Sequence, residues 1–257
     1  MTTPLALDLS FTTTGARTVF DRRRYRWPQT VGRMFYLDAS DPGRGRVIVQ
    51  NSGASLHPGD RIGQRIAATT GARIEVVGQG AMLVTGVPDG RAGAERTELR
   101  VDDGAELAFR PEPRILTAFA HARQDTHVKL GSGIVVLTDA VVVHTEVTAE
   151  TFGSFRSCVR VTTAGRILAL DAQHASSLPS PRSGLRAFAT VYLLGRRPDD
   201  AVMKRTTAPL DKMDGRSGVY AAVTSLPNGV GRAVRLAATG GGLLRAAMAE
   251  VVGHWTT

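Results

Sequence analysis

Residues 126–143 read T-H-V-K-L-G-S-G-I-V-V-L-T-D-A-V-V-V, and this stretch decides the fold. Thr126–Leu130 alternates polar and apolar side chains, and the Gly-Ser-Gly that follows has the composition of a turn. Gly133–Leu137 and Ala140–Val143 are then nearly continuous apolar runs rich in valine. β-Branched residues between turn residues at this spacing predict short strands.

The same pattern continues outward in both directions along the 257-residue chain. Turn residues again separate short apolar or alternating segments, whereas residues 11–30 show no clear period. The segments are Arg46–Gln50, Arg73–Val77, Thr97–Val101, Ser157–Val161, Arg166–Leu170, Ala187–Leu194 and Val219–Thr224. The sequence therefore predicts a mostly β protein without the βαβ alternation of common nucleotide-binding sheets.

Helices are expected only near the C-terminus. Residues 243–255 carry an apolar stripe at helical spacing, made by Leu244, Ala247, Met248, Val251 and Trp255. We expect this stripe to be buried, with Trp255 contributing most to stability or partner binding. A weaker helix is expected over residues 198–213, interrupted at Pro209. We expect one domain over residues 1–257, with a β body over about 1–195 and a helix-containing part over about 196–257.

The formal net charge is +9, which suits nucleic acid or an acidic protein partner. The arginines are scattered along the sequence, which favours a solvated surface over a nucleic-acid site. Arg22–Trp27 is a basic cluster with aromatic residues, and we interpret it as a strand edge or loop. Cys158 is the single cysteine, and neither a leader segment nor a membrane-spanning apolar run is visible, so we expect a cytoplasmic protein.

Motifs for catalysis are missing from the sequence. It contains neither the phosphate loop G-x-x-x-x-G-K-[ST] nor the nucleophile elbow G-x-S-x-G. We therefore expect no enzymatic activity. A β-helical hydrolase or lyase with paired carboxylates remains the enzyme alternative, and turnover without any partner would support it.

His144 and Glu146 form the one candidate metal pair. Their spacing in a strand would place both side chains on one face, where imidazole and carboxylate suit nickel or zinc. A solvated or hydrogen-bonded pair is the alternative, because two ligands alone do not make a tight site.

Several segments, in order, resemble the UreD (UreH) family of urease accessory proteins. Residues 47–60 resemble the family's strand leading into a G-G-x-x-x-G-D turn, and residues 104–113 resemble its Gly-Ala-x-Leu-Glu-x-Leu-Pro-x-Pro turn. Residues 149–152 resemble its Gly-Glu-x-Phe motif, and residues 225–229 with the C-terminal helix resemble its closing pattern. The resemblance covers residues 46–255. It departs at residues 143–146, which replace a Gly-Arg, and at Ala149, which replaces a glycine.

The resemblance implies a coiled, β-helix-like body with one or two helices near the C-terminus. It implies a non-catalytic scaffold or chaperone for nickel insertion into the urease apoprotein. The implied partners are UreF-type and UreG-type accessory proteins and the urease apoprotein, with no membrane partner. It implies no tightly bound cofactor, with nickel in transit through an internal water-filled passage. A basic β-rich module for nucleic acid or another acidic polymer is the alternative.

Two sets of residues are candidates for these roles. Asp60, Glu112, Asp139 and Glu150 are candidates for the polar passage or a partner-facing surface: the first two match family motif positions, Glu150 matches in part, and Asp139 has an apolar neighbourhood. In the alternative, Asp60 only ends a turn and Glu150 pairs with an arginine such as Arg156. Arg235, Met248 and Trp255 are candidates for partner contacts.

Overall fold

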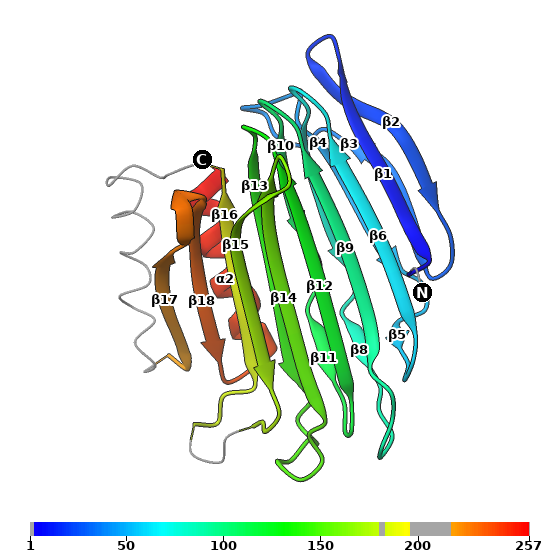
Figure 1. Ribbon diagram of the computed structural model, residues 1–257, viewed down its shortest axis with the longest axis vertical. Helices are drawn as coiled ribbons and strands as arrows, with labels where there is room; N and C mark the ends of the chain where they lie inside the picture. The colour runs from blue at the N-terminus through cyan, green and yellow to red at the C-terminus, as the bar shows by residue number, and fades with distance from the viewer. Residues whose placement is uncertain (1–2, 180–182, 196–216, 257) are drawn as a thin grey trace.

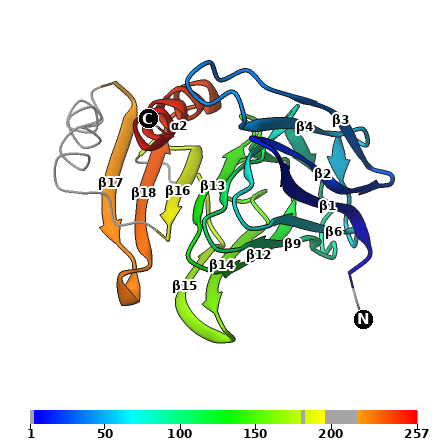
Figure 2. The ribbon, with the colours of Figure 1, turned by 90° about the horizontal axis from the view of Figure 1, so that it is seen from above.

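The computed structural model describes residues 3–179, 183–195 and 217–256, with side chains as far as residue 253. Two β-sheets face each other, and the helix α2 (Gly241–Thr256) covers the second sheet from outside (Figures 1 and 2). The mostly β fold with a C-terminal helix is therefore confirmed. The expected helix over residues 198–213 lies outside the described residues.

The first sheet has seven strands. In spatial order they are β15 (Arg166–Ala175), β14 (Ser154–Thr163), β12 (His121–Leu130), β9 (Gly93–Val101), β6 (Arg61–Ala68), β1 (Leu5–Thr14) and β2 (Arg17–Tyr25). The main path of the second sheet is β17 (Val219–Ser225), β18 (Gly231–Ala238), β16 (Ala187–Leu194), β13 (Ile134–Val143), β10 (Glu106–Arg110), β7 (Arg73–Gln79), β4 (Gly45–Asn51) and β3 (Gln29–Phe35).

The middle of the molecule is a β-solenoid. Strands β4, β7, β10 and β13 pair in parallel in one sheet, while β6, β9, β12 and β14 pair in parallel in the other. The chain passes between the sheets through short strands that also stack in parallel, namely β5 (Ser55–Leu56), β8 (Met82–Val84) and β11 (Arg114–Leu116). This winding confirms the coiled, β-helix-like body that the resemblance implies.

Antiparallel strands close both ends of the solenoid. Strands β2 and β3 pair antiparallel with β1 and β4 at one end, while β15 and the group β16–β18–β17 follow antiparallel at the other. Edge strand β2 carries Arg22, Arg23 and Arg24, and charged side chains discourage pairing with another sheet. Most of β2 is exposed, which explains why residues 11–30 show no apolar period.

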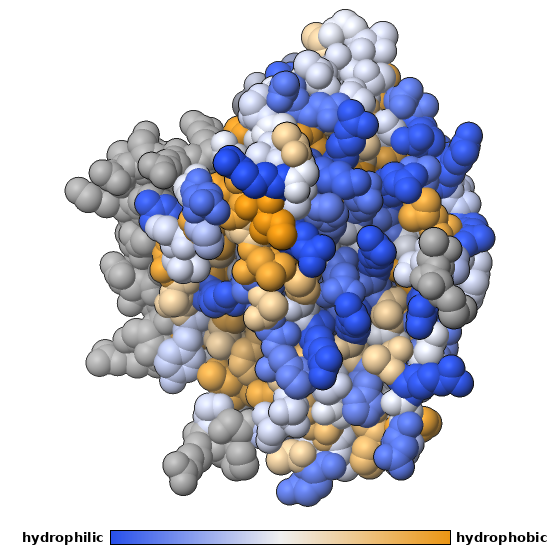
Figure 3. Space-filling model, viewed as in Figure 1, coloured by the Kyte–Doolittle hydropathy of each residue, from blue (hydrophilic) through white to orange (hydrophobic). Residues whose placement is uncertain are grey.

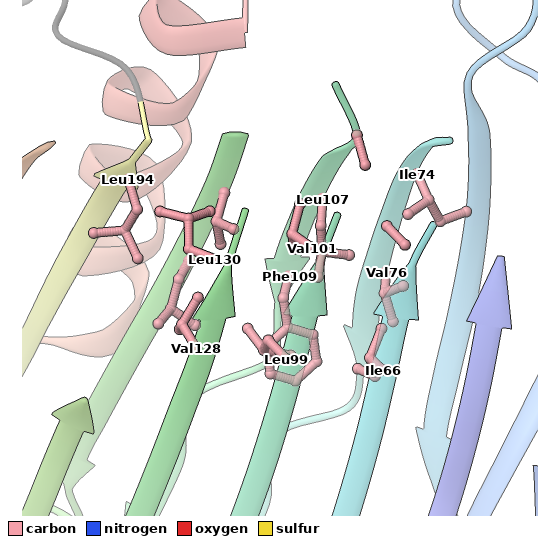
Figure 4. Close-up of a cluster of buried hydrophobic side chains, with 14 of the residues drawn as sticks. Ile66, Ile74, Val76, Leu99, Val101, Leu107, Phe109, Val128, Leu130 and Leu194 are labelled. Carbon is pink, nitrogen blue, oxygen red and sulfur yellow. The ribbon is translucent and has the colours of Figure 1, made fainter. Parts of the chain in front are cut away.

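Apolar side chains fill two layers. One layer lies between the sheets and includes Ile66, Val76, Leu99 and Val128, as Figure 4 shows. The other lies between the second sheet and α2. Strand β13 contributes side chains to both layers, so nearly all of its positions are buried. This burial on both faces is the reason for the continuous apolar runs in its sequence.

Glycines allow the corners of successive coils to stack closely. A Cβ on Gly86 would lie 2.1 Å from the backbone carbonyl of Phe119, and one on Gly153 would lie 2.2 Å from the carbonyl oxygen of Ala120. Residues with a side chain cannot approach a backbone this closely. These glycines therefore set the spacing of the coils at this end of the strands.

The apolar stripe of α2 packs on the second sheet. Leu244, Ala247, Met248 and Val251 are buried with residues of β16 and β18, whereas the side chain of Trp255 lies outside the described part. No helix among the described residues is long and apolar enough to cross a membrane.

Candidate functional site: a polar layer between the sheets

Polar residues form a row across the inner face of the first sheet. Glu95, Gln124, Ser157 and Gln173 are successive register partners on β9, β12, β14 and β15. Each takes an inward position of its strand, and no single strand shows an unusual pattern. The row becomes visible only when the strands are placed side by side.

A second polar row faces the first from the other sheet. Asp139, Thr190 and Arg235 are successive register partners on β13, β16 and β18. Arg114, on β11, joins them through its ion pair with Glu95. We call these two facing rows, together with Gln64, Asp171 and Tyr192, the polar layer.

Hydrogen bonds and ion pairs connect the two rows. Arg114 donates to both carboxylate oxygens of Glu95, with Nε–Oε2 2.5 Å and Nη2–Oε1 2.8 Å. The Ser157 hydroxyl donates to Asp139. Beyond them, Arg235 Nη2 lies 2.8 Å from both oxygens of Asp171.

The polar layer separates two apolar clusters between the sheets. Leu99, Val128 and Val159 lie on one side of it, and Ile62, Ala122 and Phe155 lie on the other. Charged groups in such surroundings are costly unless they are paired or solvated. The layer therefore lowers the stability of the core unless its charges are paired or solvated.

Asp139 is the carboxyl group whose ionised form the surroundings disfavour most clearly. Protein surrounds it, and desolvation raises the pKa of its carboxyl above the usual 3.8, against the opposing effects of the Ser157 hydroxyl and the Arg114 guanidinium. The Asp139 residue as a whole is only partly buried. A carboxyl whose pKa is raised in this way is suited to exchange a proton or, when ionised, to contact a cation.

Arg114 and Tyr192 keep their protons in this environment. Burial alone would lower the pKa of Arg114, but the Glu95 carboxylate outweighs it and holds that pKa above its ordinary value. Burial and the nearby Asp139 and Asp171 raise the pKa of the Tyr192 phenol. The phenol therefore stays protonated and donates to Asp171 Oδ2 at 2.7 Å.

One acceptor in the layer has no hydrogen-bond partner among the residues that the structure describes. Gln124 Oε1 is buried and accepts no hydrogen bond within the described part of the chain, while its amide nitrogen lies 3.5 Å from Glu95 Oε2. Buried acceptors are nearly always satisfied, so an orphan of this kind calls for a water molecule or a cation. Oxygen ligands without thiolate or imidazole would hold a divalent ion weakly.

The layer reaches the surface on two sides of the interior. On one side Gln29, Gln64, Glu95, Glu112 and Arg114 line a cavity of about 40 Å³, enough for a water molecule. On the other side Asp171 pairs with Arg235, whose side chain is 44% exposed. Polar side chains thus extend from this cavity across the interior to Asp171 on β15 and Arg235 on β18.

The structure distributes the four predicted carboxylates over different environments. Asp139 lies in the polar layer, and Glu112 lines the cavity at its side, where it accepts a 2.8 Å hydrogen bond from Arg245 of α2. Asp60 is exposed in a turn and accepts the backbone N–H of His57 at 2.9 Å. Glu150 is exposed in another turn, where the Thr148 hydroxyl and its own backbone lower the pKa of its carboxyl. Asp139 and Glu112 are thus the two that lie at the layer.

His144 and Glu146 lie in the turn after β13, where they come together at an exposed site. His144 Nδ1 is 3.6 Å from Glu146 Oε2, and the Glu146 side chain is 87% exposed. Across the described ranges, no group of three or more His, Cys, Asp and Glu side chains is arranged to hold a metal ion.

The predicted partner residues also differ in their surroundings. Arg235 lies at one end of the polar layer, where it binds Asp171. Met248 is a buried residue of α2 and also lines a groove beside this helix. The side chain of Trp255 lies outside the described residues.

Sequence reasoning missed Glu95, Arg114, Gln124 and Ser157. Glu95, Gln124 and Ser157 are polar residues at inward positions of alternating segments, and Arg114 opens the short strand β11. Recognising them as one group needs the register of the strands, which the sequence alone does not supply.

The fold and the layer define the class of protein: a β-solenoid with capped ends and a polar, charged interior layer. Comparison with known proteins then identifies the family within this class. The family described as UreD urease accessory protein matches residues 5–257. The protein named urease accessory protein UreD from Mycolicibacterium smegmatis (strain ATCC 700084 / mc(2)155) is 48% identical over 242 residues, covering 93% of this chain and 86% of that protein. Urease accessory protein UreD 2 from Bradyrhizobium sp. (strain BTAi1 / ATCC BAA-1182) is 34% identical, covering 91% and 83%.

The chain belongs to the UreD family of urease accessory proteins. Its role is accordingly that of an accessory protein in urease maturation, acting with other components of that process.

Proposed function

We propose that the chain is a non-catalytic scaffold for nickel insertion, and that nickel ions pass through the polar layer on their way to the urease apoprotein. Its proposed partners are UreF-type and UreG-type accessory proteins together with the apoprotein, in the cytoplasm. Nickel is cargo in this proposal, so no tightly bound cofactor is needed.

The observation that carries the proposal is the set of carboxylates between two apolar clusters, with an unsatisfied acceptor beside them. Asp139 is held with a raised pKa, and Gln124 Oε1 has no partner among the described residues. Replacing such a buried ionic group by apolar residues is often neutral or stabilising, so stability does not explain it. A transient cation explains both features, because it would stabilise the carboxylate and satisfy the amide oxygen.

The ligand chemistry fits transfer better than storage. The layer offers carboxylate and amide oxygens, which bind hydrated divalent ions without the strong bonds that thiolates and imidazoles form. Arg114 and Arg235 stay charged and compensate Glu95 and Asp171. A cation that enters would therefore meet modest attraction at each point, which is what movement through the layer requires.

We propose that Glu112 acts where ions enter. It lines the small cavity beside Glu95 and Arg114, and its carboxylate is held by Arg245 of α2. Breaking this ion pair would free the carboxylate, so a partner that contacts Arg245 can expose an oxygen ligand at the entrance.

A charge-neutral substitution tests the carboxylate beside the cavity. We expect Glu112→Gln to leave folding intact but to lower nickel-dependent urease activation. The measurement is urease activity after reconstitution of the apoprotein with UreF, UreG, GTP, nickel and this chain. Asp89→Asn, in an exposed turn, is the matched control and should behave as wild type. Full activation by Glu112→Gln would remove this residue from the proposed route.

A further inference from the structure

The outer face of the first sheet concentrates the positive charge of the protein. Side chains alternate along each strand, so every second position of β6, β9, β12 and β14 points outward. Figure 3 shows a predominantly hydrophilic surface over these strands. Its basic residues, which we call the basic face, are Arg61, Arg65, Arg96, Arg100, Arg123, Lys129, Arg156 and Arg160. Residues that are scattered in the sequence are thus gathered by the fold.

Like charges oppose each other across neighbouring strands of the basic face. Arg123 is the register partner of Arg156, and Arg100 is the register partner of Lys129. Adjacent strands lie about 4.8 Å apart, and like charges directly opposite are destabilising. A sheet that only had to fold would gain stability from an acidic residue at one position of each pair.

Ion pairs compensate part of the charge of the basic face, including those of Arg65 with Asp8 and of Arg100 with Asp102. On the basic face Glu98 pairs with Lys129 at 3.0 Å and Asp125 pairs with Arg123 at 2.7 Å. Arg61, Arg96, Arg156 and Arg160 form no ion pair with any carboxylate of the described ranges. The basic face therefore keeps uncompensated guanidinium groups.

His127, near the middle of the face, reports the same positive potential. Desolvation and the neighbouring Lys129, Arg160 and Arg96 lower the pKa of its imidazole, with only Glu98 opposing them. The face is also hollowed beside His127, where a depression of about 830 Å³ extends between Arg65 and Lys129. A protruding acidic element would find both space and charge there.

We propose that the basic face is a docking surface for the acidic surface of a folded protein partner in urease maturation. This inference rests on the proposed scaffold function for the choice of partners. Charge complementarity selects an acidic occupant, because carboxylates would pair with the uncompensated arginines and relieve the opposed like charges.

The surroundings of the face favour protein over nucleic acid. Ile167 and Leu170 on β15 are 55% and 53% exposed, and they adjoin Thr162 and Arg160 of the face. Figure 3 shows hydrophobic surface gathered over β15. Protein interfaces combine arginine with such apolar area, whereas single-stranded nucleic acid is held by aromatic stacking. Outward positions of the described strands β6, β9, β12 and β14 carry no Phe, Tyr or Trp.

The test is binding of the full chain to purified urease apoprotein, UreF and UreG, each measured separately by interferometry over about 50–300 mM NaCl. The variant is Arg96→Glu with Arg160→Glu. The control is Arg33→Glu with Arg91→Glu, which changes the net charge equally at exposed positions outside the basic face. Circular dichroism and thermal melting confirm that both variants are folded. Arg96→Gln with Arg160→Gln is a second, milder version of the same test.

We expect one of the three proteins to bind the wild type with an affinity that falls as salt rises. For that protein the Arg96/Arg160 reversal should weaken binding about tenfold or more, or about 1.4 kcal/mol, while the control stays close to wild type. Equal binding by wild type and face variant to all three proteins would overturn the proposal, as would an equal loss in the control. Tighter binding of a DNA duplex or single-stranded RNA at the same salt, lost in the face variant, would overturn it in favour of nucleic acid.

Failure of the proposed function looks different. If wild type supports urease activation but the face variants bind normally, only the docking surface is wrong. If wild type neither binds these proteins nor supports activation, the scaffold function fails and the docking surface fails with it.

Discussion

At the scale of single residues, Asp139 shows how the polar layer differs from the rest of the core. It interrupts a strand of valines, accepts a hydrogen bond from Ser157, and lies near both Arg114 and Glu95. Desolvation raises its pKa because nothing in its surroundings compensates the full cost of ionising it. Stability therefore depends on the protonation state of this one carboxyl.

The raised pKa of Asp139 predicts how the stability of the folded protein changes with pH. Because the folded-state pKa of Asp139 is raised, its contribution to stability is fully present below the unfolded pKa of about 3.8 and is lost as pH rises through the folded-state pKa. Asparagine mimics the neutral carboxyl. We expect Asp139→Asn to be more stable than wild type at pH 7, with the difference disappearing near pH 4.

Thermal unfolding of both proteins at a series of pH values measures this effect. A variant that is less stable than wild type at pH 7, or a difference that does not change with pH, would show that Asp139 is not strained in the folded protein.

The sequence pointed to only part of the layer at this scale. Asp139 stands out because its neighbours are apolar, and Glu112 because it lies in a recognisable motif. Glu95, Gln124 and Ser157 do not stand out, because each is an ordinary polar residue in an alternating strand. Their meaning comes from register pairs such as Gln124 with Ser157, which are residues distant in sequence.

At the scale of elements, burial explains which strands the sequence revealed. Strand β13 is covered by the interior on one side and by α2 on the other, so its apolar runs are easy to recognise. The sequence suggested two runs, Gly133–Leu137 and Ala140–Val143, where the structure has one strand; Asp139 breaks the apolar run without breaking the strand. Edge strand β2 shows no apolar period because most of its residues are exposed, and the interpretation of residues 22–27 as a strand edge or loop is confirmed.

The packing of α2 can be tested with two neighbouring leucines. Leu244 is fully buried against the second sheet, whereas Leu243 is 43% exposed. We expect Leu244→Ala to lower the free energy of unfolding by about 2–5 kcal/mol, because it leaves a cavity. Leu243→Ala should change it by no more than about 0.5 kcal/mol.

Urea unfolding of the two variants provides the measurement. Similar values for both substitutions would mean that the helix does not dock with the face shown in the structure. The expectation that Trp255 dominates the stripe stays a prediction, since its side chain lies outside the described residues.

At the scale of the whole molecule, the solenoid places two different surfaces back to back on the same strands. Inward positions of β9, β12 and β14 build the polar layer, while outward positions of the same strands build the basic face. A partner docked on the outside would thus lie one sheet away from the proposed route of the ions. The strict alternation of a β-strand allows both surfaces to exist without compromising each other.

Parallel coils also explain why the polar row is continuous. The strands β9, β12 and β14 each add one polar residue at the same level, and the parallel register brings Glu95, Gln124 and Ser157 into line. The sequence indicated the coiled body through family motifs, but periodicity alone could not supply the register. Register is a property of the assembled sheets, and a shift of one residue would turn these side chains outward.

The most direct test of the central claim is the amount of nickel transferred into urease. The apoprotein is incubated with nickel, GTP, UreF, UreG and one of three versions of this chain, and nickel per urease is then measured by mass spectrometry after gel filtration. The versions are wild type, Asp139→Asn with Gln124→Leu, and the surface control Asp89→Asn. The account predicts that the layer variant forms the same complexes but loads clearly less nickel, whereas the control loads as much as wild type. Equal nickel loading by the layer variant and the wild type would contradict it.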